Sequence, residues 1–138
     1  MLAGVLDVDY ANNTISLLIK ILGRGSRKLT ESPVNKNINA IFPLGKSFTL
    51  PEKNDKIMLA GGGSGVAPML FLAKVCGLPP ENVSVLIGAR TASDHIDVSA
   101  YAPYGQFFFT TEDGSLGEKG FVTNHSVFLN QLDAYSRI

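Results

Sequence analysis

Short alternating runs of apolar and polar positions fill roughly the first 48 residues of the chain. Residues 4–10 and 14–22 are rich in β-branched and aliphatic side chains, and turn-forming residues at 11–13 separate them. This pattern predicts an antiparallel β-hairpin. A glycine-containing loop that could open a short helix comes next, and residues 37–45 predict another strand, which a proline and a glycine end. We therefore expect this part to be half of a small barrel or sheet.

The pattern changes after a polar, proline-containing stretch near residues 49–55, where we place a linker. The sequence beyond it predicts strands over residues 56–61, 83–89 and 105–112, and helices over residues 67–77 and 120–132. Strands separated by helices imply right-handed crossovers and a parallel sheet. We therefore predict two domains, a partial antiparallel β-barrel over residues 1–50 and an α/β domain over residues 51–138.

Composition narrows the class of protein. With 138 residues, of which 45% are hydrophobic, the chain is expected to be soluble and globular with a core of its own. Twelve basic and twelve acidic residues cancel, so no global charge attracts nucleic acid or an anionic membrane. The single cysteine, Cys76, excludes an internal disulfide framework and fits a reducing compartment, so we expect a cytoplasmic protein. No apolar run approaches the roughly 20 residues of a membrane span.

A glycine-rich motif, LAGGGSGVAPML, occupies residues 59–70, between the first predicted strand of the sheet and its helix. Such a turn brings backbone N–H groups close to a phosphate, and the helix N-terminus adds partial positive charge. The dinucleotide fingerprint G-x-G-x-x-G is matched only in part, because Val66 or Pro68 takes the third glycine position, depending on the register. The order of strand, turn and helix favours a nucleotide diphosphate over a turn without a ligand.

A second glycine motif, GRGSRKL, covers residues 23–29. Gly25 permits close approach, Ser26 is a candidate N-cap, and three basic side chains surround them, Arg24, Arg27 and Lys28. The motif is either a second phosphate site or a solvated basic turn. The residues alone favour the turn.

Polar residues also follow the later strands of the predicted sheet. Arg90 comes after the second strand, where a nucleotide fold meets the adenosine ribose, and no acidic residue occupies that strand end. Arg90 could therefore contact a 2′-phosphate, stack on adenine or be solvated. Thr111, Glu112 and Ser115 follow the third strand at the edge where such sheets bind ligands. They either approach the nicotinamide end of a ligand or form a plain polar turn.

The motifs GRGSRKL, PLGKSF, LAGGGSGVAPM, IGART and TTEDGSLGEKGFVT resemble, in this order, the electron-transfer subunit of bacterial dihydroorotate dehydrogenase. That family belongs to the ferredoxin-reductase superfamily, and the resemblance covers nearly the whole chain. It implies a flavin-binding β-barrel followed by an NAD-binding α/β domain, with FAD between them. It also implies an NADH-dependent oxidoreductase, a flavoprotein that passes electrons through FAD and a [2Fe–2S] cluster to a catalytic dihydroorotate dehydrogenase subunit in pyrimidine biosynthesis.

The resemblance also implies two sets of cofactor-binding residues. Those for the FAD diphosphate are Gly23, Gly25 and Ser26, and those for the NAD diphosphate are Gly62, Gly63, Ser64, Gly65, Val66, Ala67 and Pro68. At the adenosine end the resemblance implies NAD, whereas the residues alone leave NAD and NADP open.

The chain departs from the family pattern at several places. The R-P-x-S-type flavin motif, the Cys-Gly-Pro turn and the cysteine-rich cluster segment do not occur in the sequence. We therefore expect an internal fragment with an incomplete flavin site and no ligands for the cluster.

The family's strand order, 3-2-1-4-5, leads to a further expectation. We expect strands 4 and 5 to be missing from this sequence, which leaves the strand over residues 56–61 as a sheet edge, with Ile57, Met58 and Leu59 exposed beside unpaired backbone groups. We expect such an edge, together with those of the barrel fragment, to form a homo-oligomer.

Hydride transfer requires little acid–base chemistry from a protein, because the cofactors carry it once they are aligned. We accordingly assign no catalytic residue and no metal ligand. The alternative function is a nucleotide-binding or interaction module without redox activity.

Overall fold

The N-terminal part of the chain is a β-hairpin followed by a short helix, in a computed structural model that describes residues 2–41 and 45–138. Strands β1 (Leu2–Asp9) and β2 (Thr14–Lys20) pair antiparallel, and α1 (Arg24–Thr30) follows them. The Asp9 carboxylate closes the turn by accepting hydrogen bonds from the N–H groups of Ala11 at 2.9 Å and Asn12 at 3.1 Å. The predicted hairpin and short helix are confirmed.

The strand predicted over residues 37–45 is wrong for residues 37–41, which have no strand conformation. Residues 42–44 lie outside the described part of the chain. A strand needs a ladder partner, and β1 and β2 pair only with each other among the described residues. Ile38 and Ile41 are exposed as a result. The barrel over residues 1–50 therefore stays a prediction.

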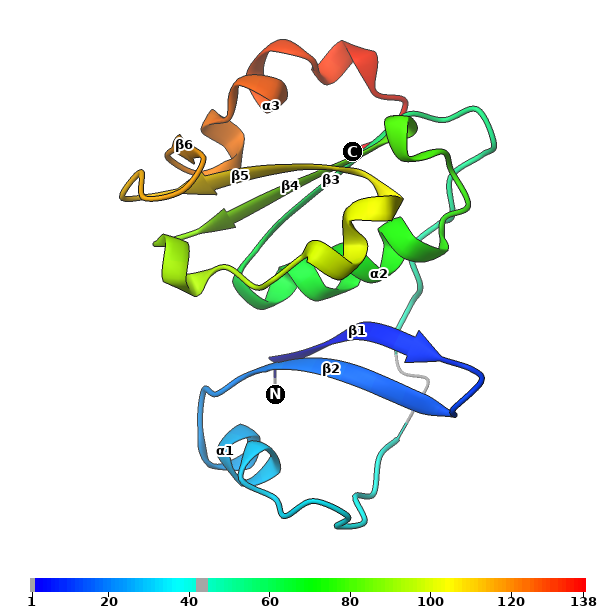
Figure 1. Cartoon of the computed structure of the whole chain (residues 1–138), viewed down its shortest axis with the longest axis vertical. Coiled ribbons are helices and arrows are strands. Elements are labelled where there is room, and N and C mark those ends of the chain that lie inside the picture. Colours follow the sequence, from blue (N-terminus) through cyan, green and yellow to red (C-terminus); the bar gives the residue numbers. More distant parts are fainter. Residues whose placement is uncertain (1, 42–44) are drawn as a thin grey trace.

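The rest of the chain forms an α/β unit around a parallel sheet (Figure 1). Its strands are β3 (Ile57–Gly62), β4 (Val83–Ala89), β5 (Gln106–Thr111) and β6 (Glu118–Lys119), in the order β3-β4-β5-β6. The first three were expected from near-continuous apolar runs, which are typical of strands covered on both faces. The two-residue strand β6 was not predicted.

Helix α2 (Val66–Val75) packs on one face of this sheet and contributes Leu70 and Ala73 to the core. Gly77 ends the helix with a φ of +73°, a conformation that favours glycine. Cys76 is the C-cap of α2 rather than a residue inside it, and its thiol donates a hydrogen bond to the Ala73 carbonyl at 3.4 Å.

The single helix predicted over residues 120–132 is wrong. The structure has a short α3 (Ser126–Asn130) between two 3₁₀ turns, Val122–Asn124 and Leu132–Ala134. His125 interrupts the segment because it is extended, with φ −65° and ψ 139°, and its Nδ1 accepts a hydrogen bond from the Val127 N–H at 3.0 Å. An N-cap therefore starts a new helix where the apolar pattern suggested one continuous helix.

The expectation of an exposed β3 is also wrong, because Ile57, Met58 and Leu59 are only 3%, 1% and 8% exposed. Helix α2 and the turn Val122–Asn124 contact this strand. The last residues of the chain lie along its outer edge, where the Met58 N–H donates to the Arg137 carbonyl at 3.0 Å. β3 is still the end strand of the sheet, as expected, but its side chains are buried and the last residues of the chain pair with its first residues.

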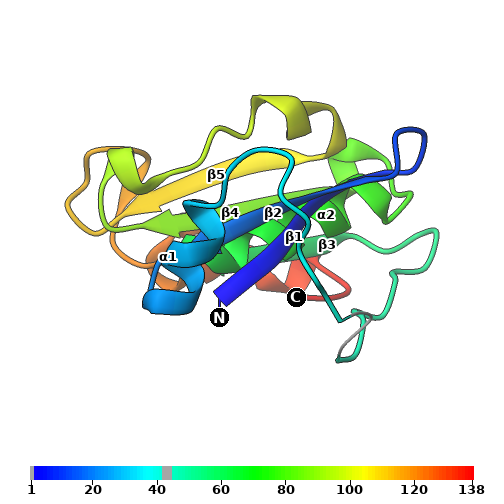
Figure 2. The same cartoon turned by 90° about the horizontal axis from the view of Figure 1, so that it is seen from below.

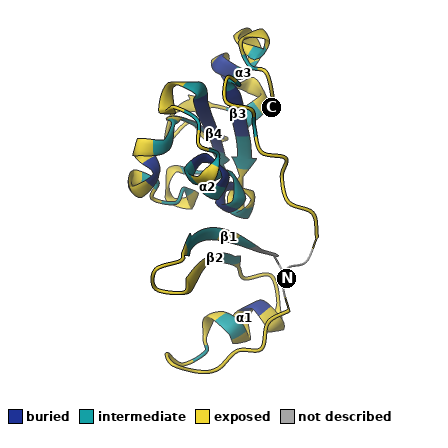
Figure 3. Cartoon of the chain, turned by 90° about the vertical axis from the view of Figure 1, so that its right-hand side faces the viewer, coloured by how far each residue is buried: buried dark blue, intermediate teal, exposed yellow. Residues whose placement is uncertain are grey.

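The hairpin lies against α2 on the side away from the sheet (Figures 1 and 2). Gly4 on β1 packs on the first turn of α2, where a Cβ on Gly4 would come within 3.0 Å of Ala67 Cβ. The Tyr101 hydroxyl donates to the Leu6 carbonyl at 2.9 Å, and Lys74 donates to Asp7 at 2.6 Å. The densest burial is in the sheet and α2, while the hairpin and α1 are mainly half-buried or exposed (Figure 3).

Within the described residues, no helix combines the length and the apolar character needed to cross a membrane. Nor do three or more His, Cys, Asp or Glu side chains of these residues gather where they could hold a metal ion.

Candidate functional site

The glycine motif connects β3 to α2 through one 3₁₀ turn, Gly63–Gly65. Gly63 has a φ of +54°, which a side chain would strain. A Cβ on Gly61 would lie 3.1 Å from the Gly65 carbonyl oxygen, so glycine there permits tight strand-to-helix packing. A Cβ on Gly63 or Gly65, in contrast, would have no protein atom within 4 Å beyond its chain neighbours. The turn therefore faces open space from which a ligand can approach its backbone.

Helix α2 begins directly after this turn and presents its N-terminus there. The first N–H groups of a helix have no partner within the helix, and the first turn of α2 contains no acidic residue. The side chains of Val66 and Ala67 are buried, so these two residues can reach a ligand only through their backbone. Pro68 lies in the same turn and has no backbone N–H. This costs the helix no hydrogen bond, because an N–H at this position would have no partner within the helix. The helix dipole therefore favours an anion at this position.

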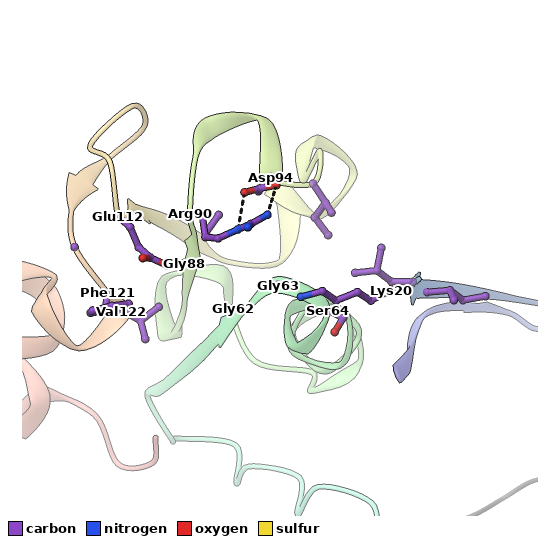
Figure 4. Close-up of a pocket in the computed structure, with 15 residues that line it drawn as sticks. Lys20, Gly62, Gly63, Ser64, Gly88, Arg90, Asp94, Glu112, Phe121 and Val122 are labelled. Carbon is purple, nitrogen blue, oxygen red and sulfur yellow. Dashed lines mark hydrogen bonds and ion pairs between the residues drawn. The ribbon is translucent and has the colours of Figure 1, made fainter. Parts of the chain in front are cut away.

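A cleft of about 540 Å³ opens beside the turn (Figure 4). Its walls come from the end of β2 and from the carboxyl ends of β3, β4 and β5, which is where parallel sheets bind ligands. The predicted site residues that line it are Gly62, Gly63, Ser64, Arg90 and Glu112. The hairpin and the α/β unit thus build one site together.

Arg90 and Asp94 both line the cleft and form an ion pair with each other. The Arg90 Nε lies 3.3 Å from one Asp94 carboxylate oxygen, although the Arg90 side chain is 78% exposed (Figure 4). Asp94 therefore supplies a carboxylate near the end of β4, where the sequence predicted none. The missed signal is the spacing of four residues, which a 3₁₀ turn over Ala92–Asp94 brings back toward Arg90.

Hydrogen bonds from the side chains of Thr111 and Ser115 stabilise the turn after β5. The buried Thr111 hydroxyl accepts from the Leu116 N–H and donates to the Leu116 carbonyl, each at 3.0 Å. The Ser115 hydroxyl donates to the Asp113 carboxylate at 2.6 Å, and this bond lowers the pKa of Asp113 below its ordinary value. Glu112, in contrast, lines the cleft. The geometry of Thr111 and Ser115 is that of a polar turn.

Several residues of the cleft were not predicted from the sequence. Gly88 lets Val122 pack over the end of β4, since a Cβ on Gly88 would lie 2.8 Å from Val122 Cγ1. Phe121 lines the cleft although it is 62% exposed. Lys20 reaches the cleft from the hairpin. No local signal could have found Lys20, because only packing brings β2 to the sheet.

The second glycine motif is arranged differently from the prediction. Gly23, in an extended conformation, is the N-cap of α1, whereas Ser26 lies inside the helix, so its N-cap assignment is wrong. The Ser26 hydroxyl accepts from the N–H groups of Leu22 at 2.9 Å and Gly23 at 3.2 Å, and it donates to the Gly23 carbonyl at 3.1 Å. Because these bonds occupy the Ser26 hydroxyl, a phosphate at this motif would meet main-chain N–H groups instead of that hydroxyl. A Cβ on Gly25 would meet no protein atom within 4 Å beyond its own helix turn.

The basic residues around this motif line a separate surface groove. They are Arg24, Arg27, Lys28 and Lys36. Glu31 also lines the groove and lies 3.9 Å from Arg27, with both side chains largely exposed. This groove and the cleft at the glycine turn share no lining residue.

Comparison with known proteins finds no matching family model. The chain is 36% identical over 118 residues to the dihydroorotate dehydrogenase B (NAD⁺) electron transfer subunit of Clostridium acetobutylicum, covering 85% of this chain and 46% of that protein. It is 33% identical over 132 residues to the subunit of the same name from Streptococcus pneumoniae, covering 94% of this chain and 50% of that protein. The chain therefore spans about half the length of the curated relatives it matches.

One solved structure extends the comparison to the fold. It is a structure of the NADH-dependent reduced ferredoxin–NADP oxidoreductase, described for flavin-based electron bifurcation. The TM-score is 0.70 at 25% identity, over 88% of this chain and 44% of the other. The motif resemblance is thus confirmed: over most of its length this chain, with its ferredoxin-reductase-like α/β fold, is similar to the dihydroorotate dehydrogenase B electron transfer subunits.

Proposed function

We propose that this chain binds NADH in the cleft at the glycine turn and takes part in electron transfer from NADH through FAD. The observation that carries the proposal is the meeting of an open glycine turn and a helix N-terminus with a cleft at the carboxyl ends of the strands. The diphosphate binds at Gly62, Gly63 and Ser64. The cofactors supply the hydride chemistry when bound, and the residues of this chain bind and orient them.

The adenosine half of the ligand extends toward Arg90 and Asp94. A carboxylate near the end of the second sheet strand accepts hydrogen bonds from ribose hydroxyls and repels a 2′-phosphate. Because Asp94 already pairs with Arg90, the arginine offers less charge to a 2′-phosphate. The site is therefore proposed to take NADH in preference to NADPH, with Arg90 stacked on the adenine.

The comparisons support a proposal for the flavin and for the partner. We assign residues 1–50 to the flavin-binding domain and residues 51–138 to the NAD-binding domain, with the FAD diphosphate on the main chain at Gly23, Gly25 and Ser26. The relatives are named as electron transfer subunits of dihydroorotate dehydrogenase B. We therefore propose a catalytic dihydroorotate dehydrogenase subunit as the partner, in pyrimidine biosynthesis. The [2Fe–2S] cluster of the family is proposed to bind outside this chain.

The experiment is a titration of the purified chain with NADH, followed by its fluorescence, and then with NADPH and FAD. We expect saturable NADH binding that is tighter than NADPH binding. Loss of the visible absorbance of added FAD when NADH is supplied without oxygen would support electron transfer. No saturable binding of NADH would contradict the proposal.

A binding module without redox activity is the second candidate. Two observations favour it. The Ser26 hydroxyl is already hydrogen-bonded to the main chain at Leu22 and Gly23, and residues 2–41 and 45–56 contain no third barrel strand. The same titrations separate the two candidates. NADH binding without FAD binding and without FAD reduction would select the module.

We also propose that the hairpin mediates self-association. Among the described residues, neither strand of the hairpin has a ladder partner at its outer edge, and Ile15 and Leu17 on β2 are about half exposed. Sedimentation at micromolar concentration is expected to show a dimer or larger species, and Leu17→Lys is expected to shift it toward a monomer. A wild-type monomer would contradict this proposal.

A further inference from the structure

We propose that Glu118 is a positioning residue for the cleft, because its carboxylate holds the segment of residues 120–122 in place. Gly120, Phe121 and Val122 of this segment line the cleft, and Figure 4 shows Phe121 and Val122 side by side at one end of it. Glu118 is not among the residues that line the cleft, so it acts on a ligand only through this segment. The inference rests on the proposed dinucleotide site and adds to it a residue that shapes one wall.

The Glu118 carboxylate joins the two ends of a loop. Glu118 belongs to the two-residue strand β6, and Ser126 is the first residue of α3. One carboxylate oxygen of Glu118 accepts a hydrogen bond from the Ser126 N–H at 2.8 Å, and the other accepts one from the Ser126 hydroxyl. Residues 119–125 therefore form a loop that one side chain closes, and the cleft-lining segment lies inside this loop.

The buried ring of His125 adds to this connection. Its Nε2 lies 3.5 Å from the Glu118 carboxylate, and its Nδ1 accepts the hydrogen bond from the Val127 N–H. A neutral imidazole that accepts at Nδ1 carries its proton on Nε2, the nitrogen that lies near the carboxylate. The ring also packs edge-on against Phe108 of β5, with ring centroids 5.6 Å apart. Glu118 is thus connected to the start of α3 and, through His125, to the sheet.

Phe121 depends on this connection more than its neighbour Val122 does. The Phe121 side chain is largely exposed, so burial does not fix it, whereas Val122 packs over the end of β4. The Phe121 N–H donates to the Asn124 side chain at 3.0 Å, and its carbonyl accepts from the Asn124 N–H at 2.8 Å. Asn124 is two residues before Ser126, so the position of Phe121 depends on where α3 begins. The carboxylate bonds to α3 therefore limit the movement of the Phe121 ring.

The charge of Glu118 separates positioning from simple electrostatics. Its hydrogen bonds, first of all the one from the Ser126 hydroxyl, hold the pKa of Glu118 below its ordinary value, so the side chain is an anion at pH 7. An anion repels a diphosphate, so removing it would strengthen NADH binding if charge alone mattered. A loosened wall has the opposite effect, because affinity falls with the fraction of the chain that keeps the binding-competent conformation. The two roles therefore predict opposite signs.

The test measures the NADH affinity of full-chain variants by fluorescence titration. Glu118→Ala removes both bonds to Ser126 and is expected to weaken NADH binding about three- to tenfold. Glu118→Gln loses the charge, but its amide can accept from the Ser126 N–H and donate to the hydroxyl oxygen, so its affinity is expected to stay within about twofold of the wild type. Glu81→Ala, which removes an exposed carboxylate at the opposite end of β4, is the control and is expected to match the wild type.

A double-mutant cycle tests whether Glu118 acts through the wall. Phe121→Ala alone is expected to weaken NADH binding, because it removes an aromatic ring from the cleft. The loss caused by Glu118→Ala is then expected to be smaller in the Phe121→Ala background than in the wild type. Hydrogen exchange at residues 120–124 is expected to be faster in Glu118→Ala and unchanged in Glu118→Gln. Circular dichroism at the temperature of the titrations checks that each variant folds.

A milder variant keeps the test decisive if Glu118→Ala does not fold. Ser126→Ala removes only the bond from the hydroxyl and leaves the Ser126 N–H in place. It is expected to weaken NADH binding about twofold, because one of the two hydrogen bonds to the carboxylate remains. Unchanged affinity in this variant would then overturn the role of Glu118.

The outcomes separate this inference from the proposed function. Equal or tighter NADH binding by a folded Glu118→Ala would overturn the positioning role and leave the dinucleotide site standing. Equal losses in Glu118→Gln and Glu118→Ala would overturn it as well, because the hydrogen bonds would then not matter, and so would additive losses in the cycle. A wild-type chain that does not bind NADH would overturn the proposed function itself, and this inference with it.

Discussion

The ammonium group of Lys74 on α2 donates a hydrogen bond of 2.6 Å to the carboxylate of Asp7 on β1. This bond holds the pKa of Asp7 below its ordinary value and raises the pKa of Lys74 above its own. Both side chains are only partly exposed, so solvent screens the pair incompletely. The pair therefore helps to hold the hairpin against the α/β unit.

Replacing Asp7 with Asn is expected to lower the Tm at pH 7 by about 2–5 °C, because the charge partner of Lys74 is lost. The pKa of Asp7 is lower in the folded than in the unfolded chain. Its contribution to stability is therefore complete above the unfolded value of about 4 and is lost as the pH falls through the folded value. Thermal unfolding followed by circular dichroism at pH 7, 5 and 3 measures this.

The difference in Tm between wild type and Asp7→Asn is expected to be full at pH 7 and smaller at pH 3, because it is lost as the pH falls below the unfolded pKa and through the lowered folded pKa. Asp133→Asn, at an exposed position that forms no ion pair with the described residues, is the control and is expected to leave the Tm unchanged. A difference that stays constant over this pH range would show that packing, and not charge, explains the effect.

Gly4→Ala is expected to loosen the hairpin from α2. The new methyl group would lie 3.0 Å from Ala67 Cβ and 3.1 Å from Pro68 Cδ, so β1 would have to shift. We expect the free energy of unfolding in urea to fall by about 1–3 kcal/mol, as for overpacking in a core. Gly25→Ala, which meets no atom within 4 Å, is the control. Equal effects of the two variants would contradict the close packing of Gly4.

Gly65→Val is expected to abolish NADH binding while the chain still folds. Gly65 has helical φ and ψ of −69° and −12°, and a Cβ there would meet no protein atom within 4 Å, so valine fits the structure. The valine would add bulk directly after Gly62, Gly63 and Ser64, where the diphosphate is proposed to bind. Fluorescence titration measures affinity, and circular dichroism measures folding. Unchanged NADH affinity would contradict the proposed binding of the diphosphate at this turn.

Arg90→Ala tests which part of the ligand this side chain contacts. If Arg90 stacks on adenine, the variant is expected to weaken NADH and NADPH binding by similar factors of about 2 to 5, typical of an exposed cation over an aromatic ring. NADH is expected to remain the tighter ligand. A loss confined to NADPH would show that Arg90 instead pairs with a 2′-phosphate. Parallel titrations with both nucleotides decide between these roles.

The hairpin, the three main strands and α2 were predictable because each follows from a local pattern. Alternating or continuous apolar runs mark the strands, and Gly77 marks the end of α2 through its positive φ. The strand over residues 37–41 and the helix over residues 120–132 failed for a shared reason. A strand needs a pairing partner and a helix can be interrupted by a cap such as His125, and neither follows from hydrophobicity alone.

By itself, the sequence determined the parallel α/β architecture and the glycine turn between β3 and α2, since glycine backbone freedom and apolar periodicity are properties of neighbouring residues. Only the tertiary structure decided which side chains share the cleft with that turn. Lys20 arrives from the hairpin because β1 docks on α2. The burial of Ile57 likewise depends on layers contributed by distant segments. Contacts between such segments are set by packing in three dimensions, and no local pattern in the chain encodes them.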